Sequence, residues 1–471
     1  MEESTVPKAT QELLPEIHPE ILSEIIAACK NVTTDPADLI LYSFDATRVR
    51  HMPECVAFPE STDEVSALLK VCTKYKIPVT PRGAGTGFTG ASIPLKGGLV
   101  IALTRMKKIL LVNEEALYCE VEPGVINYDL GKEIAKLGLF YPPDPASMKS
   151  STIGGNVMTG AGGPSAIKYG VTRDYVMGLT AVLADGSVIN TGIKTEKGVV
   201  GYDLTRLFVG SEGTLGIITK IRLKLIPLPS AVVTANAVFV SRKDAIGAVS
   251  KILHARLLPR TLEYIDRTAI RCAEEYLKEG LPVDAGAILL IETDGDMEAA
   301  IEEMNKIREV CAKAGAREFH MSHADEDAQK LWKVRRSISA ALTRLRPTKI
   351  NEDVTVPRNR IADLMERLDE ISKKTGLPII NFGHAGDGNI HVNVMTDAEN
   401  KEEYGLALKT VDEIMDVVLE LDGTISGEHG VGIAKIPYIA KELGENAIEL
   451  SKRLKSAFDP LGIMNPGKIF P

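Results

Sequence analysis

The chain has 471 residues, of which 44% are hydrophobic and 25% are charged, and its formal net charge is -9. This length and balance are typical of a globular enzyme of two or three domains, whose core is large enough to need no disulfide framework. The acidic balance argues against a general affinity for nucleic acid or for an anionic membrane, so we expect neither as a partner.

None of the six cysteines stands in a C-x-x-C pair. This argues against zinc ribbons and cysteine-ligated iron–sulfur clusters, and so few cysteines in a long chain favour a reducing compartment. Met1 to Ala28 lack the pattern of a signal peptide, and no run of about 18 apolar residues would form a transmembrane segment. We therefore predict a cytoplasmic protein, which a partner would have to hold if it works at the inner membrane.

The first part of the chain alternates between helical and strand signals. Ile17, Ile21, Leu22 and Ile25 recur at helical spacing, so residues 1–50 are expected to form a helical segment. The further elements expected are a strand at 55–59, a helix at 61–75 capped by Ser61 or Thr62, strands at 77–80, 98–103 and 116–121, a helix at 128–137, a β-hairpin at 176–190 and a strand at 217–225.

The cluster Pro227-Leu-Pro229 indicates a domain boundary. The residues after it follow an α+β pattern, similar to a ferredoxin-type cap. The expected elements are a strand at 232–240, helices at 243–254 and 267–278, a strand at 287–292, a helix at 297–314, two strands around a glycine loop at 377–393 and a helix at 402–421.

Glycines concentrate in two stretches, residues 81–90 and 152–164. The first contains Gly85-x-Gly87-x-x-Gly90, which matches the dinucleotide-binding string. A Rossmann unit needs a helix directly after these glycines, but here a strand is expected, so we reject that interpretation. Consecutive small residues leave backbone N–H groups unshielded, and Gly83 to Gly87 could therefore hold a pyrophosphate. A glycine-rich turn without a ligand is the alternative; the second stretch and Ser211–Gly216 disfavour it.

Two histidines flank a tight glycine loop, at His384 and His391, and a second glycine-flanked pair follows at Glu428 and His429. Two strands joined by such a loop lie side by side, so His384 and His391 can converge; His391 and Asn393 share one face of their strand. Two histidines and one carboxylate make a common site for a divalent ion. Buried polar residues without a ligand remain the alternative.

The run Leu331-Trp-Lys-Val-Arg335-Arg336 is basic. By residue type alone we favour a solvated basic helix face over a binding site for this run.

Several long motifs together carry a family resemblance. These are Pro81-Arg-Gly-Ala-Gly-Thr-Gly, Pro142-Pro-Asp-Pro145, Thr152-Ile-Gly-Gly-Asn156, Leu207-Phe-Val-Gly-Ser-Glu-Gly-Thr-Leu-Gly216 and Asn465-Pro-Gly-Lys468. The sequence from about residue 40 to 471 resembles the FAD-linked D-2-hydroxy-acid dehydrogenases, which include flavin-type D-lactate dehydrogenases and the glycolate oxidase flavin subunit.

The resemblance implies an α+β fold of the vanillyl-alcohol-oxidase (p-cresol methylhydroxylase, PCMH) type. After the helical segment 1–50, residues 51–228 would form an FAD-binding domain of two subdomains. Residues 229–471 would form a ferredoxin-like α/β cap that binds substrate, with the tail 455–471 returning to the flavin.

The resemblance also implies cofactor contacts. The pyrophosphate would lie against Arg82, Gly83, Ala84, Gly85, Thr86, Gly87 and Gly90; the ribityl chain and ring against Pro143, Asp144, Thr152, Gly155 and Asn156; the adenine half near Glu212, Gly213, Gly216 and Ile217; and the isoalloxazine near Asn465. Relatives with covalent flavin carry a histidine where Thr86 stands here, so we predict non-covalent FAD.

For the second site, the resemblance implies metal ligands at His384, His391 and Glu428, with zinc, manganese or iron left open, and a catalytic base at His429. Substrate residues at matching positions are Arg335, which would bind the carboxylate, Asn393, Ser339 and Lys349. Ser339 stands at the position where D-2-hydroxyglutarate dehydrogenase has a threonine. Lys349 is offset along the sequence from the position of that enzyme's lysine. A short acid is therefore expected rather than a dicarboxylate.

The predicted reaction is oxidation of D-lactate to pyruvate by hydride transfer to FAD. Because the chain has no cysteine cluster and no Rossmann unit, a separate acceptor is expected: a quinone, a cytochrome, an electron-transfer flavoprotein or an iron–sulfur subunit. The alternatives are a glycolate oxidase flavin subunit, a D-2-hydroxyglutarate dehydrogenase, a relative of alkyl-glycerone phosphate synthase and, outside the enzymes, a flavin electron-carrier subunit. Homo- or hetero-oligomerisation stays open.

Overall fold

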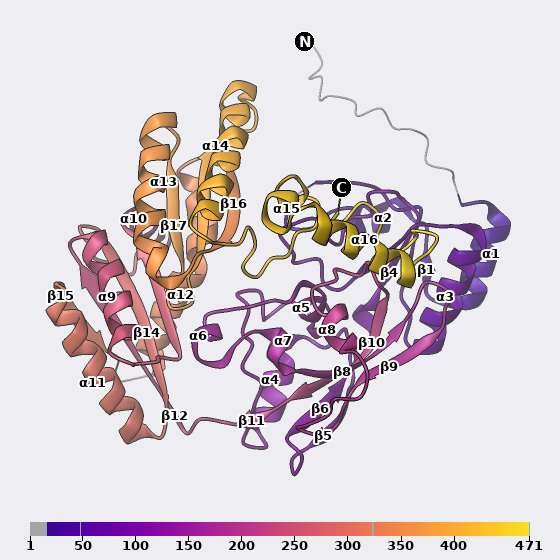
Figure 1. Cartoon of the computed structure of the whole chain (residues 1–471), viewed down its shortest axis with the longest axis horizontal. Coiled ribbons are helices and arrows are strands. Elements are labelled where there is room, and N and C mark those ends of the chain that lie inside the picture. Colours follow the sequence, from indigo (N-terminus) through magenta and orange to yellow (C-terminus); the bar gives the residue numbers. More distant parts are fainter. Residues whose placement is uncertain (1–16, 48, 323–324, 471) are drawn as a thin grey trace.

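The computed structural model describes residues 17–47, 49–322 and 325–470 (Figure 1). Two lobes lie side by side. The lobe at the right carries the N-terminal half, and the lobe at the left carries the helices and strands from β12 to α14. Part of the segment in which no signal peptide was expected, residues 1–16, lies outside the described residues.

The first lobe contains a four-stranded sheet in the order β1-β2-β4-β3, a five-stranded sheet in the order β5-β6-β10-β8-β9 and the pair β11-β7. Its strands are β1 Val32–Thr33, β2 Cys55–Ala57, β3 Val79–Arg82, β4 Leu99–Ala102, β5 Ile109–Asn113, β6 Tyr118–Val121, β7 Leu139–Phe140, β8 Val176–Val182, β9 Val188–Gly192, β10 Ile217–Lys224 and β11 Ile226–Pro227. Its helices are α1 Pro19–Ala28, α2 Pro36–Tyr42, α3 Thr62–Tyr75, α4 Asn127–Ala135, α5 Ile153–Thr159, α6 Ala166–Tyr169, α7 Thr172–Tyr175 and α8 Leu204–Phe208.

Most elements of this lobe lie where the sequence predicted them. The Ser61 hydroxyl caps α3 by accepting the N–H of Glu64, and β8 and β9 form the predicted antiparallel hairpin. The predicted start of the strand at 77–80 is wrong by two residues, because β3 begins at Val79. The N–H of Ile77 bonds the carbonyl of Cys72, which ends the helix. Pairing with β4 therefore begins at Val79.

The second glycine stretch, residues 152–164, contains the short helix α5. The Thr152 hydroxyl caps this helix by accepting the N–H of Gly155, and Gly160 ends it in the left-handed conformation. A Cβ at Gly154 would lie 2.5 Å from Pro123. Glycine therefore lets the helix approach its neighbour closely.

The second lobe is built on a seven-stranded antiparallel sheet in the order β15-β12-β14-β13-β17-β18-β16. Its strands are β12 Ala231–Phe239, β13 Thr261–Asp266, β14 Ala287–Gly295, β15 Ala316–Met321, β16 Thr348–Thr355, β17 Ile379–His384 and β18 Asn389–Thr396. Its helices are α9 Arg242–His254, α10 Arg267–Leu277, α11 Met297–Lys313, α12 Asp325–Ala341, α13 Ile361–Thr375 and α14 Lys401–Glu420.

Three strands of this sheet, β13, β15 and β16, were missed by the sequence analysis. All six residues of β13 are buried, and the alternation of polar and apolar residues in Thr261-Leu-Glu-Tyr264 is broken by Ile265. β15 is an edge strand whose three polar residues are exposed. In both strands the period-two signal of a half-buried strand extends over only about four residues.

Helices cover both faces of this sheet. The larger hydrophobic cluster packs α9, α11, α13 and α14 against one face. A smaller cluster packs α10 and α12 against the other face, around Ile265, Phe382 and Met395. The second face therefore carries the side chains of β13, β17 and β18 toward α12.

The C-terminal part of the chain returns to the first lobe. Helices α15 Ile436–Leu443 and α16 Glu445–Phe458 follow α14, and the ring of Phe458 contacts Phe208 of α8 with centroids 5.7 Å apart. Beyond them, Met464 forms an isolated parallel bridge with Val79, and Ile463 and Met464 are part of the core of the four-stranded sheet. All six cysteines are buried free thiols. No helix in the described part of the chain has both the length and the apolar composition that crossing a membrane requires.

Candidate active site

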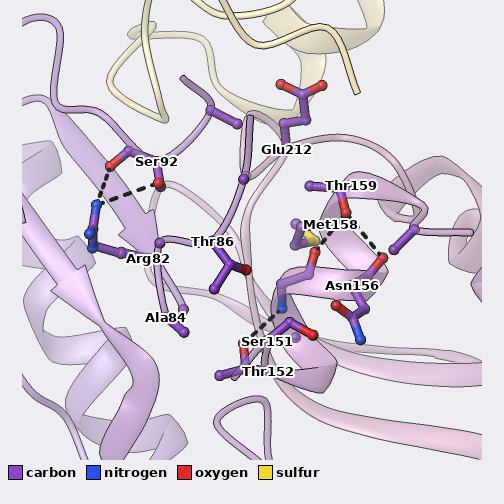
Figure 2. A pocket seen from close by; sticks show the side chains of 18 of the residues that line it. Arg82, Ala84, Thr86, Ser92, Ser151, Thr152, Asn156, Met158, Thr159 and Glu212 are labelled. Atoms are coloured by element: carbon purple, nitrogen blue, oxygen red, sulfur yellow. Dashed lines mark hydrogen bonds between the residues drawn. The ribbon is translucent and has the colours of Figure 1, made fainter. Parts of the chain in front are cut away.

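A deep cleft crosses the first lobe and reaches the second (Figure 2). Its walls bound about 1160 Å³ of space, part of which is open to solvent. Three segments of the first lobe form its walls: residues 81–92, the start of α5, and residues 212–218. Glu428 and His429 close it from the second half of the chain. One continuous space therefore joins the glycine stretches to the predicted metal and base residues.

The first glycine stretch crosses the cleft without a helix after it, as expected. The Arg82 guanidinium is buried and donates to the carbonyl and hydroxyl oxygens of Ser92 (Figure 2). A Cβ at Gly83 would lie 2.4 Å from the Thr152 hydroxyl. Gly85 has a φ of 70°, and a Cβ there would lie 2.2 Å from Arg82. These contacts require small residues, which leave the backbone open to a ligand.

Most of the predicted cofactor residues line this cleft. They are Arg82, Gly83, Ala84, Gly85, Thr86, Gly87, Thr152, Gly155, Asn156, Glu212, Gly213, Gly216 and Ile217. The described lining residues that sequence reasoning missed include Phe88, Ser92, Ser151, Met158 and Thr159. Apart from their closeness to the glycine motifs, these residues carry no signal of their own.

Four predicted cofactor residues are not among the described residues that line the cleft: Gly90, Pro143, Asp144 and Asn465. The Asp144 carboxylate accepts the N–H and hydroxyl of Ser165, and burial raises its pKa to about 6. The Asn465 amide donates to the carbonyls of Ala91 and Glu212. These two side chains therefore brace the loops that form the cleft.

The two strands of the predicted histidine hairpin bring His384 and His391 together. Their ring centroids are 5.3 Å apart. Glu428 reaches both, because its Oε1 lies 3.5 Å from His384 Nε2 and 3.6 Å from His391 Nε2. One ligand atom from each of these three residues lies within 4.8 Å of the others.

The cluster fits a divalent ion. His384 and His391 are buried, and His384 Nε2 has no hydrogen-bond partner among the described residues. Burial lowers the pKa of His391 well below its ordinary value, with His384 adding to the effect, which favours the neutral ring that a metal requires. His384 Nδ1 faces Glu263 Oε1 at 2.5 Å. A carboxylate behind a metal-binding histidine fixes the ring and its tautomer.

Glu263, which sequence reasoning missed, also holds Arg335. Arg335 Nε donates to Glu263 Oε2 at 2.6 Å, and the guanidinium stacks on Phe382. Burial alone would raise the pKa of Glu263, but Arg335 and His384 lower it to about 2. Arg335 is 7% exposed. The interpretation of residues 331–336 as a solvated basic helix face is therefore wrong for Arg335. It holds for Lys333 and Arg336, which are exposed.

His429 lies between the cluster and the cleft. Its ring stacks on Phe88 with centroids 5.2 Å apart, and on His391 at 5.5 Å. His429 Nε2 is 3.9 Å from Glu428 Oε1, and Nδ1 is 3.9 Å from Asp353 Oδ2. Burial opposes ionisation of Asp353, but His429 and Lys435 lower its pKa. A carboxylate near Nδ1 favours a proton there and leaves Nε2 as the acceptor.

The remaining predicted substrate residues have partners within the second lobe. The Asn393 amide nitrogen donates to the carbonyls of Ile380 and His391, and its Oδ1 is buried without a described partner. Lys349 Nζ donates to the hydroxyl and carbonyl oxygens of Ser339, one turn along α12 from Arg335.

Comparison with known proteins identifies the family. The description "FAD binding domain" matches residues 53–192, and "FAD linked oxidases, C-terminal domain" matches residues 228–469. The chain belongs to the FAD-linked oxidases. Glycolate oxidase subunit GlcD of Bacillus subtilis is 46% identical, over 94% of this chain and 95% of that protein. D-lactate dehydrogenase of Anaerostipes hadrus is 37% identical, over 88% and 89%.

The fold comparison agrees. The solved structure of p-cresol methylhydroxylase with substrate bound has a TM-score of 0.80, covering 95% of this chain and 96% of that chain at 20% identity. The predicted α+β fold of the PCMH type is therefore confirmed. This FAD-linked oxidoreductase binds FAD in its first lobe, where the glycine stretches line the cleft.

Replacing Glu263 should destabilise this FAD-linked oxidase strongly. Glu263→Gln leaves the buried Arg335 without its counter-charge, which destabilises a protein by roughly 3–5 kcal/mol. The measurement is the urea midpoint of the second lobe. Glu318→Gln is the matched control, because Glu318 pairs with Arg317 at the surface, where such pairs contribute about 0–1 kcal/mol. Equal midpoints for the two variants would contradict the assignment of Glu263.

Proposed function

We propose that this protein oxidises a short 2-hydroxy acid, either D-lactate or the achiral glycolate, to the 2-oxo acid. The observation that carries the proposal is the buried cluster of His384, His391 and Glu428, which stands with Arg335 and His429 beside the flavin cleft. The names of the two relatives above support these acids. The sequence favoured D-lactate, and the higher identity to a glycolate oxidase subunit favours glycolate as the second candidate.

Arg335 would bind the substrate carboxylate. Its described hydrogen bond to Glu263 is made by Nε, which leaves the terminal nitrogens of the guanidinium for two parallel bonds to a carboxylate. Glu263 and the Phe382 ring hold the guanidinium plane in one orientation. An acid bound there would lie near the histidine cluster, because Glu263 contacts both Arg335 and His384.

His429 would take the hydroxyl proton at Nε2, the nitrogen that faces Glu428. Asp353, near Nδ1, stabilises the ring as it becomes positively charged. A divalent ion held by His384, His391 and Glu428 would supply Lewis acidity that lowers the pKa of the substrate hydroxyl. FAD, when bound, supplies the acceptor for the hydride from Cα. Phe88 covers the outer side of His429 and limits the access of water.

The FAD is expected to be bound without a covalent link. His429 is the one histidine among the described residues that line the cleft, and it belongs to the base site. Thr86 stands on the wall where covalent relatives have a histidine. Electrons would leave to a separate acceptor, and the word "subunit" in the name of the GlcD relative supports a protein partner. We place the enzyme in the cytoplasm with this partner.

An electron-carrier subunit without its own substrate is disfavoured. Such a protein needs no carboxylate-binding arginine and no base, yet Arg335 and His429 are both braced by buried carboxylates here.

Substituting His429→Ala should slow reduction of the bound flavin by D-lactate at least 100-fold, because a general base contributes about 10²–10⁴ in rate. Anaerobic stopped-flow bleaching of the flavin absorbance measures this. His320→Ala is the control, since His320 is exposed on β15. Flavin content should equal that of the wild type in both variants, and rapid bleaching of His429→Ala would discard the base assignment.

Removing the divalent ion should abolish flavin reduction by hydroxy acids while dithionite still reduces the flavin. Dialysis against a chelator, with metal content measured by mass spectrometry, gives the test; adding back Zn²⁺, Mn²⁺ or Fe²⁺ one at a time identifies the ion that restores the rate. The substrates are D-lactate, L-lactate, glycolate and D-2-hydroxyglutarate, and we expect the first and third to react fastest. A metal-free protein with full activity would refute the metal site.

Acid precipitation should leave a colourless protein pellet and release the yellow flavin to the supernatant, since no histidine stands at position 86. Absorbance at the flavin maximum is read in both fractions. Colour that stays with the pellet after denaturation means a covalent link.

A further inference from the structure

The loop 426–432, which carries Glu428 and His429, is held from both lobes by carboxylates. On the side of the second lobe, Asp353 of β16 is fully buried. Its Oδ2 accepts the N–H groups of Glu428 and His429, each at 2.9 Å. The carboxylate therefore fixes the peptide groups of the two residues that the proposed reaction uses.

On the side of the flavin lobe, Glu212 holds the next part of the same loop. Its Oε1 accepts the N–H of Val431 at 2.6 Å, and its Oε2 accepts the N–H of Gly432 at 2.8 Å. Figure 2 shows the side chain of Glu212 pointing away from the labelled residues of the glycine stretch, toward the yellow C-terminal ribbon. Glu212 also lines the flavin cleft. One residue thus touches both the cleft and the loop.

The surroundings of Glu212 are built for this contact. Its backbone has a φ of 51°, which a non-glycine residue adopts rarely. A Cβ at Gly430 would lie 2.5 Å from Glu212 Oε1, so the loop approaches the carboxylate as closely as glycine allows. The Thr89 carbonyl accepts the N–H groups of Ile433 and Ala434, so the contact between this segment and the first lobe continues past Gly432.

We propose that Glu212 is a positioning residue, which sets the loop 426–432 in register with the flavin cleft so that Glu428 and His429 face the substrate. Asp353 fixes the position of the loop relative to the cap, and Glu212 fixes its position relative to the flavin cleft. This inference rests on the proposed function, because it assigns Glu212 to the placement of the proposed base and metal ligand.

The same geometry excludes a simpler role as a flavin contact made by the carboxylate. Both oxygens are occupied by the N–H groups of Val431 and Gly432 and are turned from the cleft. The sequence had assigned Glu212 to the adenine half of FAD. The structure assigns its backbone to the cleft wall and its side chain to the loop.

The test is Glu212→Gln in the FAD-loaded protein at pH 8. The Gln side chain has one acceptor oxygen and carries an NH2 group in place of the second carboxylate oxygen of Glu212. One N–H group of the loop therefore loses its partner. We expect kcat with D-lactate or glycolate to fall at least tenfold and KM to change less than threefold. Flavin content and reduction by dithionite should match the wild type. Hydrogen–deuterium exchange at Val431 and Gly432 should rise at least tenfold.

Glu442→Gln is the matched control. Glu442 is an exposed carboxylate of α15 that accepts the N–H of Ile425 at the start of the same segment, where water or an amide oxygen can replace it. We expect less than a twofold change in kcat. Gly430→Ala places a Cβ against the Glu212 carboxylate and leaves the residues of the cleft wall unchanged. This variant should reproduce the effects of Glu212→Gln. It keeps the proposal testable if Glu212→Gln does not fold.

Two results would overturn the inference: unchanged exchange at Val431 and Gly432, or raised exchange with a wild-type kcat. Failure of the proposed function is distinguishable, because in that case no 2-hydroxy acid bleaches the wild-type flavin, whereas the exchange measurement still reports whether Glu212 holds the loop.

Discussion

The second lobe is organised around one buried charge. Glu263 has no exposed surface, and an isolated carboxylate in such a place would be strongly unfavourable. It is tolerated because Arg335 and His384 bind its two oxygens from different elements, α12 and β17. The requirement to neutralise this charge therefore fixes the distance between Arg335 and the histidine cluster. In the proposed function, that distance has to match a small acid whose carboxylate and hydroxyl are on adjacent carbons.

A second constraint is that the reacting groups come from separate lobes. The flavin cleft belongs to the first lobe, whereas Arg335 and the two histidines of β17 and β18 belong to the second. The loop 426–432 contributes Glu428 and His429 to the place where the two lobes meet. Four of its peptide N–H groups donate to carboxylates, two to Asp353 and two to Glu212. A loop of glycines would be mobile without such partners. Burial raises the pKa of Glu212 to about 7, against the effect of the two N–H groups, which shows how closely this carboxylate is enclosed.

Local signals in the sequence predicted much of this arrangement. The hairpin of His384 and His391 follows from strand pairing around a glycine loop, and the glycine stretches follow from the need for open backbone. The sequence did not predict Glu263 or Asp353, because both lie on strands that were missed and their partners are 72 and 76 residues away along the chain. Arg335 was misjudged by residue type alone for the same reason: its burial depends on a counter-charge, Glu263, on a strand that was missed.

The shared fold does not by itself select a substrate. The protein of known structure with a TM-score of 0.80 is named for p-cresol, a phenol that has no carboxylate. A cleft for such a molecule needs no buried arginine aimed at an anion. Here the cap places a guanidinium held by Glu263, a cluster of two imidazoles and one carboxylate, and a stacked imidazole within one small volume. Each of these groups is polar and largely removed from water, so an apolar substrate would leave them without partners, which is unfavourable. The polarity of the cap site therefore discriminates against phenols by desolvation as much as it attracts a hydroxy acid by charge.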